Sequence, residues 1–277
     1  MTTQDAIALG AEALPRRRGI PDPPREARWL LARAWGVDEV SLRIHPEREV
    51  PAEVEARYRR WLERRAAGEP AHHLTGSCPF YGREFAVSPA VLVPRPETEL
   101  LVQVALELPI SPTARVLDVG TGSGCIAVTL AAERPRWRVE AVDRSAVALE
   151  VARANAARYG AEVRFHEGDL TESFEPPWDL VVANLPYIPT GALAGLPREV
   201  GRDPTGALDG GADGLVLVRR LVADLPRLLR VCGAAVLELG DDQADDVAEL
   251  AVAAGLGVAR RITDAGGCER IVALQPR

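Results

Sequence analysis

The chain has 277 residues, of which 47% are hydrophobic and 26% are charged, and its net charge is −7. This length and composition are typical of a globular protein with one large domain or two ordinary ones. No apolar run approaches the ~20 residues that a membrane-spanning helix needs. The N-terminus also lacks the basic-then-apolar order of a signal peptide. We therefore expect a cytoplasmic protein with no membrane partner.

All 33 basic residues are arginine, so mechanisms that use a lysine nucleophile, a Schiff base or a P-loop lysine are excluded. The negative net charge argues against a broad basic surface, and we expect no direct nucleic-acid partner. Arginine clusters at Arg16–Arg18 and between residues 57 and 65 fit solvated helix faces. The four cysteines are far apart and His72 and His73 are adjacent, which predicts buried free thiols and no metal site.

Three regions follow one another along the chain. Residues 1–72 carry apolar side chains three and four apart, as in 23–37 and 51–68, which predicts a small helical domain. Residues 73–96 are rich in glycine and proline, with short alternating runs around 83–87 and 91–93. This pattern predicts a β-hairpin or an extended linker. Residues 97–277 then form the third region.

In this third region a helix is predicted from Pro96, and strands alternate with helices from Ala114 onward. The predicted strands are 114–120, 138–143, 162–169, 179–184, 233–240, 257–263 and 269–275. The predicted helices between them are 123–134, 145–160, 214–230 and 242–255. Such alternation implies an α/β fold with a mostly parallel, doubly wound sheet, in which ligands bind at the carboxyl ends of the strands.

The first strand of this series ends in a glycine turn, LDVGTGSGC. Gly120, Gly122 and Gly124 alternate with Thr121 and Ser123, and glycines let the backbone turn tightly and approach a ligand closely. The spacing is G-x-G-x-G and differs from the G-x-G-x-x-G of dinucleotide enzymes. Alone, such a turn is equally compatible with a plain strand-to-helix connection.

The next two strands also end in groups that suit a nucleoside. Asp143 can accept both hydroxyls of a ribose, although alone it could cap a helix, a duty that Ser145 could share. Asp169 and Leu170 stand where the edge and face of an adenine could lie. Together the pattern D-x-G-x-G-x-G, Asp, Asp resembles the class I S-adenosylmethionine-dependent methyltransferases.

This resemblance implies a Rossmann-like fold with a mostly parallel seven-stranded sheet beside the small N-terminal helical domain. It also implies S-adenosyl-L-methionine as cofactor and S-adenosylhomocysteine as product. The implied cofactor-binding residues are Gly120, Thr121, Gly122, Ser123, Gly124, Asp143, Asp169, Leu170 and Asn184.

The fourth strand ends on Asn184, followed by Leu185, Pro186 and Tyr187. NLPY is similar to the N/D-P-P-Y motif of methyltransferases that act on a planar NH2 nitrogen, whose lone pair is delocalised. The amide oxygen of Asn184 and the carbonyl of Leu185 could each accept one N–H of such a group. They would orient the nitrogen and offset the positive charge that develops on it, without a strong base.

The flanking sequence narrows the acceptor. Residues 79–102 (PFYGREFAVSPAVLVPRPETELLV), 69–76 (EPAHHLTG) and 198–215 (REVGRDPTGALDGGADGL) resemble the protein-(glutamine-N5) methyltransferases that act on peptide chain release factors, the PrmC/HemK family. The resemblance implies transfer of a methyl group to the glutamine of the release-factor GGQ loop, in translation termination. Residues 184–187 would form the glutamine pocket and the helical domain would recognise the release factor. We expect the protein to be a monomer.

Leu185 departs from the family, which has proline at this position. The residue before Pro186 is still restricted to an extended conformation, but leucine adds an N–H and some backbone freedom. Three alternatives remain: N5-glutamine methylation of a ribosomal protein, adenine-N6 methylation of nucleic acid, and a cofactor-binding domain without catalysis. The PRPETE sequence at 94–99 favours the release factor over the ribosomal protein.

Overall fold

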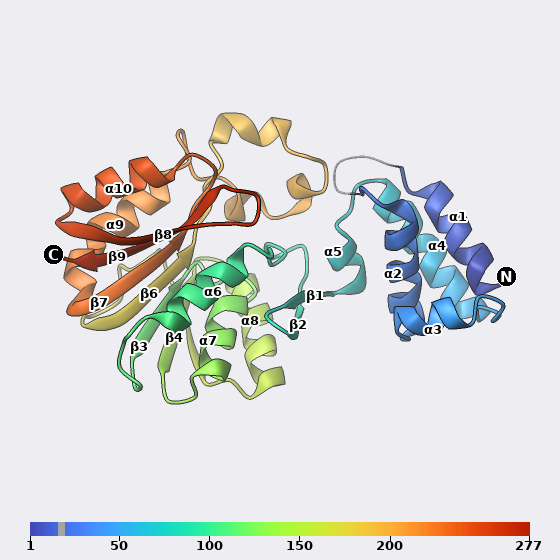
Figure 1. Ribbon diagram of the computed structural model, residues 1–277, viewed down its shortest axis with the longest axis horizontal. Coiled ribbons are helices and arrows are strands. Elements are labelled where there is room, and N and C mark those ends of the chain that lie inside the picture. Colours follow the sequence, from blue (N-terminus) through green and yellow to red (C-terminus); the bar gives the residue numbers. More distant parts are fainter. Residues whose placement is uncertain (16–19) are drawn as a thin grey trace. The chain divides into compact units, whose positions relative to one another are not determined.

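The computed structural model describes residues 1–15 and 20–277 (Figure 1). The chain divides into two compact units. One contains Met1–Ser77 with Gly195–Arg202, and the other contains Cys78–Ala194 with Asp203–Arg277. The cluster Arg16–Arg18 lies outside the described residues. No described helix has the length and apolar character that crossing a membrane requires.

The first unit is helical, as its periodicity predicts. Its α-helices are α1 (Thr3–Ala13), α2 (Pro23–Trp35), α3 (Glu39–Ile44), α4 (Ala52–Ala66) and α5 (Ala71–Thr75). The side chains of Thr2, Asp22 and Asp38 accept backbone N–H bonds at the starts of α1, α2 and α3. Buried apolar residues of α1, α2 and α4 form a core of their own, so this unit does not depend on the sheet for its hydrophobic centre.

One prediction for this unit is wrong. Arg65 belongs to the arginine cluster that was expected to be solvated, yet its side chain is only 2% exposed. Its guanidinium pairs with Glu26, and it bonds Glu199 at 2.9 Å and the carbonyl of Glu69 at 3.0 Å. A buried arginine is tolerated here because carboxylates compensate its charge. Through Glu199 it also fastens the segment 195–202 to the helical unit.

The linker forms a two-stranded sheet of β1 (Ser77–Phe80) and β2 (Arg83–Ala86). The alternating run at 91–93 is not a strand, and prolines at 89 and 94 flank it, which deprive a ladder of donors. Val91 and Val93 instead bury their side chains in a small cluster with Cys78. The prediction of buried thiols holds for Cys78 and Cys125; Cys232 is exposed and Cys268 is partly exposed.

The second unit contains a seven-stranded sheet with the strand order β5-β4-β3-β6-β7-β9-β8. Every strand pair from β5 to β7 is parallel, and β9 runs antiparallel to both of its neighbours. The strands are β3 (Arg115–Val119), β4 (Arg138–Asp143), β5 (Val163–Glu167), β6 (Trp178–Asn184), β7 (Leu229–Glu238), β8 (Leu256–Thr263) and β9 (Glu269–Pro276). All seven predicted strands are present, although β7 begins inside the segment predicted as a helix.

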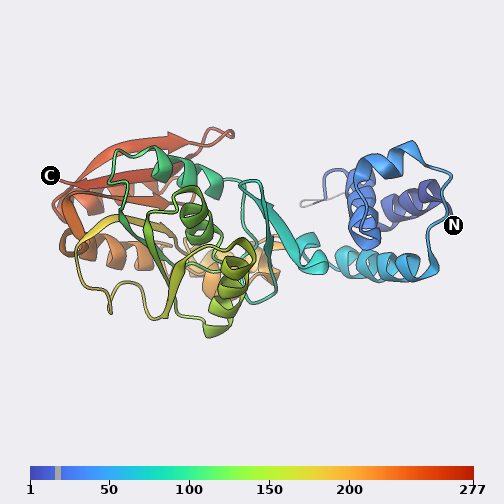
Figure 2. The same cartoon turned by 90° about the horizontal axis from the view of Figure 1, so that it is seen from below.

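Helices cover both faces of this sheet (Figures 1 and 2). They are α6 (Thr98–Glu107), α7 (Cys125–Glu133), α8 (Ala146–Tyr159), α9 (Val216–Leu228) and α10 (Ala244–Ala253), with 3-10 turns at Thr190–Gly195, Val200–Arg202 and Thr205–Ala207. Side chains of α6, α7 and α8 share one apolar cluster with the sheet, and those of α9 and α10 share another. The fold is therefore doubly wound, and strands β3, β4 and β6 end together at the edge where ligands of such sheets bind.

Candidate active site

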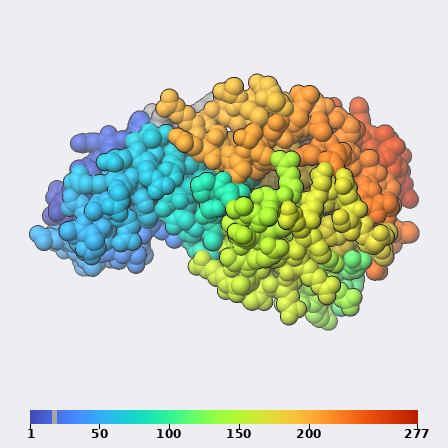
Figure 3. Space-filling model, turned by 180° about the vertical axis from the view of Figure 1, so that it is seen from behind, coloured from blue at the N-terminus to red at the C-terminus, as the bar shows by residue number. Residues whose placement is uncertain are grey.

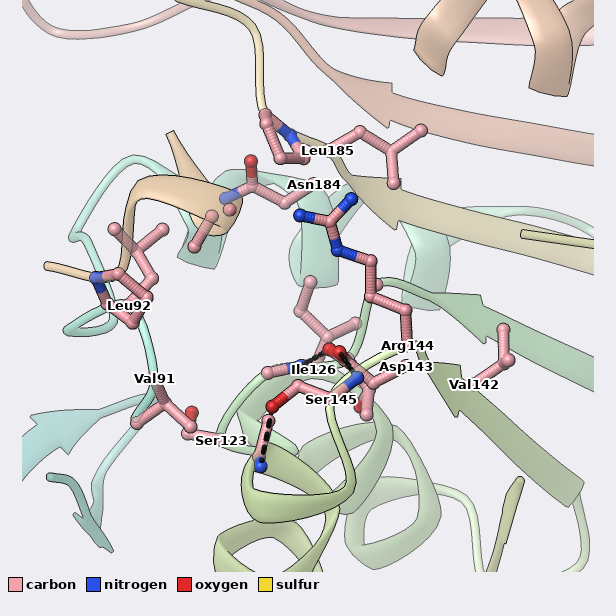
Figure 4. A pocket seen from close by; sticks show the side chains of 18 of the residues that line it. Val91, Leu92, Ser123, Ile126, Val142, Asp143, Arg144, Ser145, Asn184 and Leu185 are labelled. Atoms are coloured by element: carbon pink, nitrogen blue, oxygen red, sulfur yellow. Dashed lines mark hydrogen bonds between the residues drawn. The ribbon is translucent and has the colours of Figure 1, made fainter. Parts of the chain in front are cut away.

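A cavity of about 330 Å³ opens at the carboxyl ends of β3, β4 and β6 (Figure 4). This volume is within the range of small-molecule sites. Ser123, Asp143 and Ser145 lie on one side of it, and Asn184 and Leu185 lie on the opposite side. The predicted residues that line it are Gly120, Thr121, Gly122, Ser123, Asp143, Asp169, Leu170, Asn184, Leu185 and Pro186.

The glycine turn connects β3 to α7. Gly120, Gly122 and Gly124 have φ of 77°, 54° and 78°, a left-handed conformation that L-residues with a side chain adopt at a cost. Gly124 is further restricted because a Cβ there would lie 3.0 Å from that of Ala152. Asn155 donates to the carbonyl of Ser123 at 2.9 Å, which fixes the turn to α8.

Beneath this turn lies a carboxyl group that sequence reasoning did not single out. Asp118 is fully buried at the end of β3 and accepts from Thr121 Oγ1 at 2.6 Å and from the Ala127 N–H at 3.2 Å. Its Oδ1 has no hydrogen-bond partner among the described residues. Burial raises the pKa of Asp118 to about 7. Asp118 is the aspartate that begins the D-x-G-x-G-x-G pattern, and this position is the sequence signal that could have identified it.

Asp143 ends β4 and supports the glycine turn directly. One of its oxygens accepts from the Gly122 N–H at 2.8 Å and the other from the Ser145 N–H at 2.9 Å. Ser145, in turn, caps α8 by accepting from the Ala148 N–H. The helix cap therefore belongs to Ser145. Because each carboxylate oxygen can accept more than one bond, Asp143 retains acceptor capacity for hydroxyl groups in the cavity.

Asp169 and Leu170 follow β5. The exposed carboxylate of Asp169 pairs with Arg220 of α9 at 2.7 Å, so a ligand that bonds this carboxylate must share it with a guanidinium. Leu170 has φ of 50°, which is uncommon for leucine. Strain of this kind is concentrated at functional sites, and here it occurs in the cavity lining.

Arg144 is a further lining residue that the sequence did not indicate. A Cβ on Gly206 would lie only 2.4 Å from its guanidinium, so the segment 204–207 packs closely on Arg144. In Figure 3 yellow-green atoms, from the middle of the sequence, border orange atoms from the part after residue 200. Arg144 and Gly206 therefore close the cavity on this side.

Asn184 is the last residue of β6, and its side chain is fixed by a buried threonine. Its Nδ2 donates to Thr98 Oγ1 at 3.1 Å. Thr98 is the first residue of α6 and is 2% exposed. Directly beside Asn184 in the parallel register of β6 and β7 stands Glu238. Neither Thr98 nor Glu238 was predicted as a site residue, because both come from elements distant in sequence.

The leucine that departs from the family packs into the protein core. The side chain of Leu185 is 4% exposed and lies in the same cluster as Val119 and Leu215. Its Cδ2 would be 3.0 Å from a Cβ on Gly120, so Leu185 packs directly against the glycine turn. Tyr187 lies beside the cavity and is absent from its lining. Burial raises the pKa of Tyr187 to about 12, which keeps its hydroxyl neutral.

The residues that follow Asn184 are held by the segment 208–214. Ile188 makes two backbone hydrogen bonds with this segment: its N–H donates to the carbonyl of Leu208 at 3.1 Å, and its carbonyl accepts from the Gly210 N–H at 2.8 Å. The carbonyl of Tyr187 accepts from Gln243 Nε2 at 3.0 Å. A Cβ on Gly214 would lie 2.3 Å from that same carbonyl. The glycines of the GGADG sequence therefore let this segment brace the loop.

S-adenosylmethionine fits the residues at this site. The glycine turn brings its backbone to the cavity, Asp143 has acceptor capacity of the kind that ribose hydroxyls require, and Asp118 Oδ1, which has no hydrogen-bond partner among the described residues, lies beneath the turn. Apolar residues complete the lining, as a purine ring requires. No group of three or more His, Cys, Asp or Glu side chains in the described chain is arranged to hold a metal.

Two family models match the chain. The PrmC N-terminal domain matches residues 5–76, and the methyltransferase small domain matches residues 96–194. Relatives of similar length include the release factor glutamine methyltransferase of Koribacter versatilis, which is 45% identical over 83% of this chain and 84% of the relative. The protein of the same name from Burkholderia pseudomallei is 42% identical over 97% of this chain and 96% of the relative.

Solved structures agree on the fold. A methyltransferase from Pyrococcus furiosus has a TM-score of 0.54 and 20% identity, with coverage of 70% of this chain and 89% of that one. The ribosomal protein L11 methylase of Lactobacillus delbrueckii has a TM-score of 0.53 and 17% identity, with coverage of 72% and 90%. The predicted fold, a class I methyltransferase domain with an N-terminal helical region, is confirmed. From the identity and coverage of its relatives, the chain belongs to the release factor glutamine methyltransferase family.

Proposed function

We propose that this chain transfers a methyl group from S-adenosylmethionine to the side-chain nitrogen of the glutamine in the GGQ motif of a peptide chain release factor. One observation carries the proposal: Asn184, fixed by Thr98, faces the glycine turn and Asp143 across a single cavity. A methyl donor held on one side would thus be next to a planar amide held on the other. The helical unit would recognise the release factor.

Within this scheme the glycine turn and Asp143 bind the cofactor. Backbone N–H groups at the start of α7 favour a carboxylate, and Asp143 would accept the ribose hydroxyls. Leu170 would lie against the adenine ring, and Asp169 would receive its amino group beside Arg220. S-adenosylmethionine supplies an electrophilic methyl group on a sulfonium sulfur, which retains the electrons of the broken carbon–sulfur bond.

The acceptor side belongs to residues 184–187. The amide oxygen of Asn184 and the carbonyl of Leu185 would each accept one N–H of the glutamine, which turns its nitrogen toward the methyl group. The nitrogen forms the new bond to carbon with its lone pair and gives up one proton to water. Because positive charge develops on nitrogen as this happens, two fixed oxygen acceptors stabilise the transition state more than the ground state.

The test offers labelled S-adenosylmethionine with four acceptors: an intact release factor, its GGQ glutamine-to-alanine variant, ribosomal protein and DNA. We expect label only in the intact release factor. Label in the alanine variant, in the ribosomal protein or in DNA, with none in the intact release factor, overturns the proposal.

A further inference from the structure

Glu238 is a buried carboxyl group that the scheme above does not use. It is the last residue of β7, is 2% exposed, and stands opposite Asn184 in the parallel register of β6 and β7. Its Oε2 has no hydrogen-bond partner among the described residues. A buried carboxyl with an unsatisfied oxygen costs stability, so its position beside the acceptor asparagine calls for a functional reason.

The hydrogen-bond donors near Glu238 are Asn184 itself and Thr98, which also bonds Asn184. The hydroxyl of Thr98 and the amide of Asn184 both favour the ionised form of Glu238 as hydrogen-bond donors. Asn184 Nδ2 also donates to Thr98 Oγ1 at 3.1 Å. Because that threonine oxygen is an acceptor for Asn184, its own proton is free to point to the carboxyl. The three side chains therefore form one hydrogen-bonded group, in which Asn184 donates to Thr98 and both act as donors to Glu238.

We propose that Glu238 is a positioning residue for methyl transfer: through Thr98 it fixes the amide of Asn184 with its oxygen toward the acceptor nitrogen, and its negative charge strengthens that oxygen as an acceptor. An ionised carboxyl offers only acceptors, so the NH2 of Asn184 must face it and the oxygen must face away. A negative charge behind the amide also favours the positive charge that develops on the methylated nitrogen. This role rests on the proposed function.

The ionisation of Glu238 makes the role testable by pH. Burial raises its pKa to about 7, against the opposing effect of Thr98 and Asn184. Other charged or titratable groups that act on it come from the N-cap of α6, from β9, from the segment after β6 and from the first residue of α7. They are Glu97, Arg270, Tyr187 and Cys125. Arg270 is itself paired with Asp264 at 2.9 Å and with Asp241 at 2.5 Å, so it only partly offsets the burial.

The first experiment compares kcat/KM for the release factor in wild type and in Glu238→Gln from about pH 6 to about pH 8. We expect the ratio of wild type to variant to rise with pH through about 7 and to level off at about 10- to 100-fold. Taking the ratio cancels the titration of other groups, including Asp118. Cofactor affinity should be unchanged. Glu249→Gln, on the exposed side of α10, is the matched control and should give a ratio of one throughout.

Two further measurements test the role of Glu238, and the first does not need Glu238→Gln to fold. Thr98→Val removes the acceptor of Asn184 and one of the two donors to Glu238, and it should reduce kcat/KM in the same pH-dependent way. In a double-mutant cycle, Glu238→Gln should cost nothing more once Asn184 is alanine. Two results would overturn the role of Glu238. One is a wild-type-to-variant ratio of kcat/KM that is constant with pH; the other is fully additive losses of kcat/KM in the double mutant.

The last measurement needs neither cofactor nor substrate. The side-chain NH2 resonances of Asn184, assigned by their loss in Asn184→Ala, should shift with a midpoint near pH 7 in wild type and stay constant in Glu238→Gln. If they titrate but no release factor is methylated, the contact stands and the proposed function fails. If the release factor is methylated but these resonances do not titrate, the function stands and the inference fails.

Discussion

The side-chain amide of Asn184 can serve an incoming NH2 group in only one orientation, because only its oxygen accepts hydrogen bonds. The bond from its Nδ2 to Thr98 selects that orientation before any ligand arrives. Preorganised acceptors of this kind cost no rearrangement at the moment of reaction. The contribution of Asn184 to the site is therefore its side-chain oxygen, which the hydrogen bond from Nδ2 to Thr98 orients.

Removal of that oxygen should therefore affect the chemical step and leave cofactor binding alone. In Asn184→Ala we expect kcat to fall by about 100-fold or more, with the dissociation constant of S-adenosylmethionine within about twofold of wild type. Single-turnover transfer and calorimetric titration measure the two quantities. Full activity in the alanine variant would remove Asn184 from the mechanism.

Asp143 should behave in the opposite way. Its carboxylate holds the Gly122 N–H and would accept the ribose hydroxyls, so Asp143→Ala loses both the ligand contact and the shape of the glycine turn. We expect the dissociation constant of S-adenosylmethionine to rise by about 10-fold or more, since hydrogen bonds to a charged group are worth about 1.5–3 kcal/mol. Unchanged affinity by calorimetric titration would contradict the ribose contact.

At the scale of elements, the NLPY loop owes its shape to residues that do not touch the cavity. The segment 208–214 bonds Ile188 on both sides, and Gln243 holds the carbonyl of Tyr187. Glycine is needed at 214 because a Cβ would meet that carbonyl at 2.3 Å. The loop is thus braced against a second loop and the start of α10.

Gly214→Ala should displace this loop and reduce methyl transfer, while cofactor affinity is retained. The matched control is Gly255→Ala, because Gly255 also has a left-handed φ, 83°, but nothing lies within 4 Å of its added Cβ. Both variants bear the same backbone strain of about 1–2 kcal/mol, and only Gly214→Ala adds the clash. Equal activity losses in the two variants would show that the brace has no role in transfer.

Sequence patterns predicted the strand ends well and the cross-strand partners poorly. The glycine turn, Asp143 and Asn184 were found because each follows a buried strand, and parallel strands bring their ends together. Thr98 and Glu238 were missed because their meaning depends on which strand lies beside which. Arg65 was misassigned for a related reason, since its partner Glu199 is distant in sequence. Periodicity reports burial along one element and carries no information about pairing between elements.

At the scale of the whole molecule, two buried carboxyl groups make stability depend on pH. Burial raises the pKa of both Asp118 and Glu238 to about 7 in the folded protein. In the unfolded chain both groups titrate near their ordinary values, about 4. The folded state thus holds more protons between these values, so its stability is greatest below about pH 4 for these two groups and is lost as pH rises through 7.

We therefore expect Glu238→Gln to be more stable than wild type at about pH 8 and nearly equal to it at about pH 4, with a difference on the order of 3 kcal/mol. Urea unfolding at the two pH values measures this difference, and Glu249→Gln should show none. If the difference in free energy of unfolding between Glu238→Gln and wild type is the same at both pH values, burial does not favour the neutral form of this carboxyl group. The same variant should lose activity, so stability and function would here have opposite requirements.

The position of the methyl group on the product tests the proposed reaction most directly. Tandem mass spectrometry of a release factor, after incubation with the protein and S-adenosylmethionine, can assign the modified residue and atom. We expect one added methyl group on the side-chain nitrogen of the GGQ glutamine, present with wild type and absent with Asn184→Ala. A methyl group on any other residue, or equal modification by the alanine variant, would contradict it.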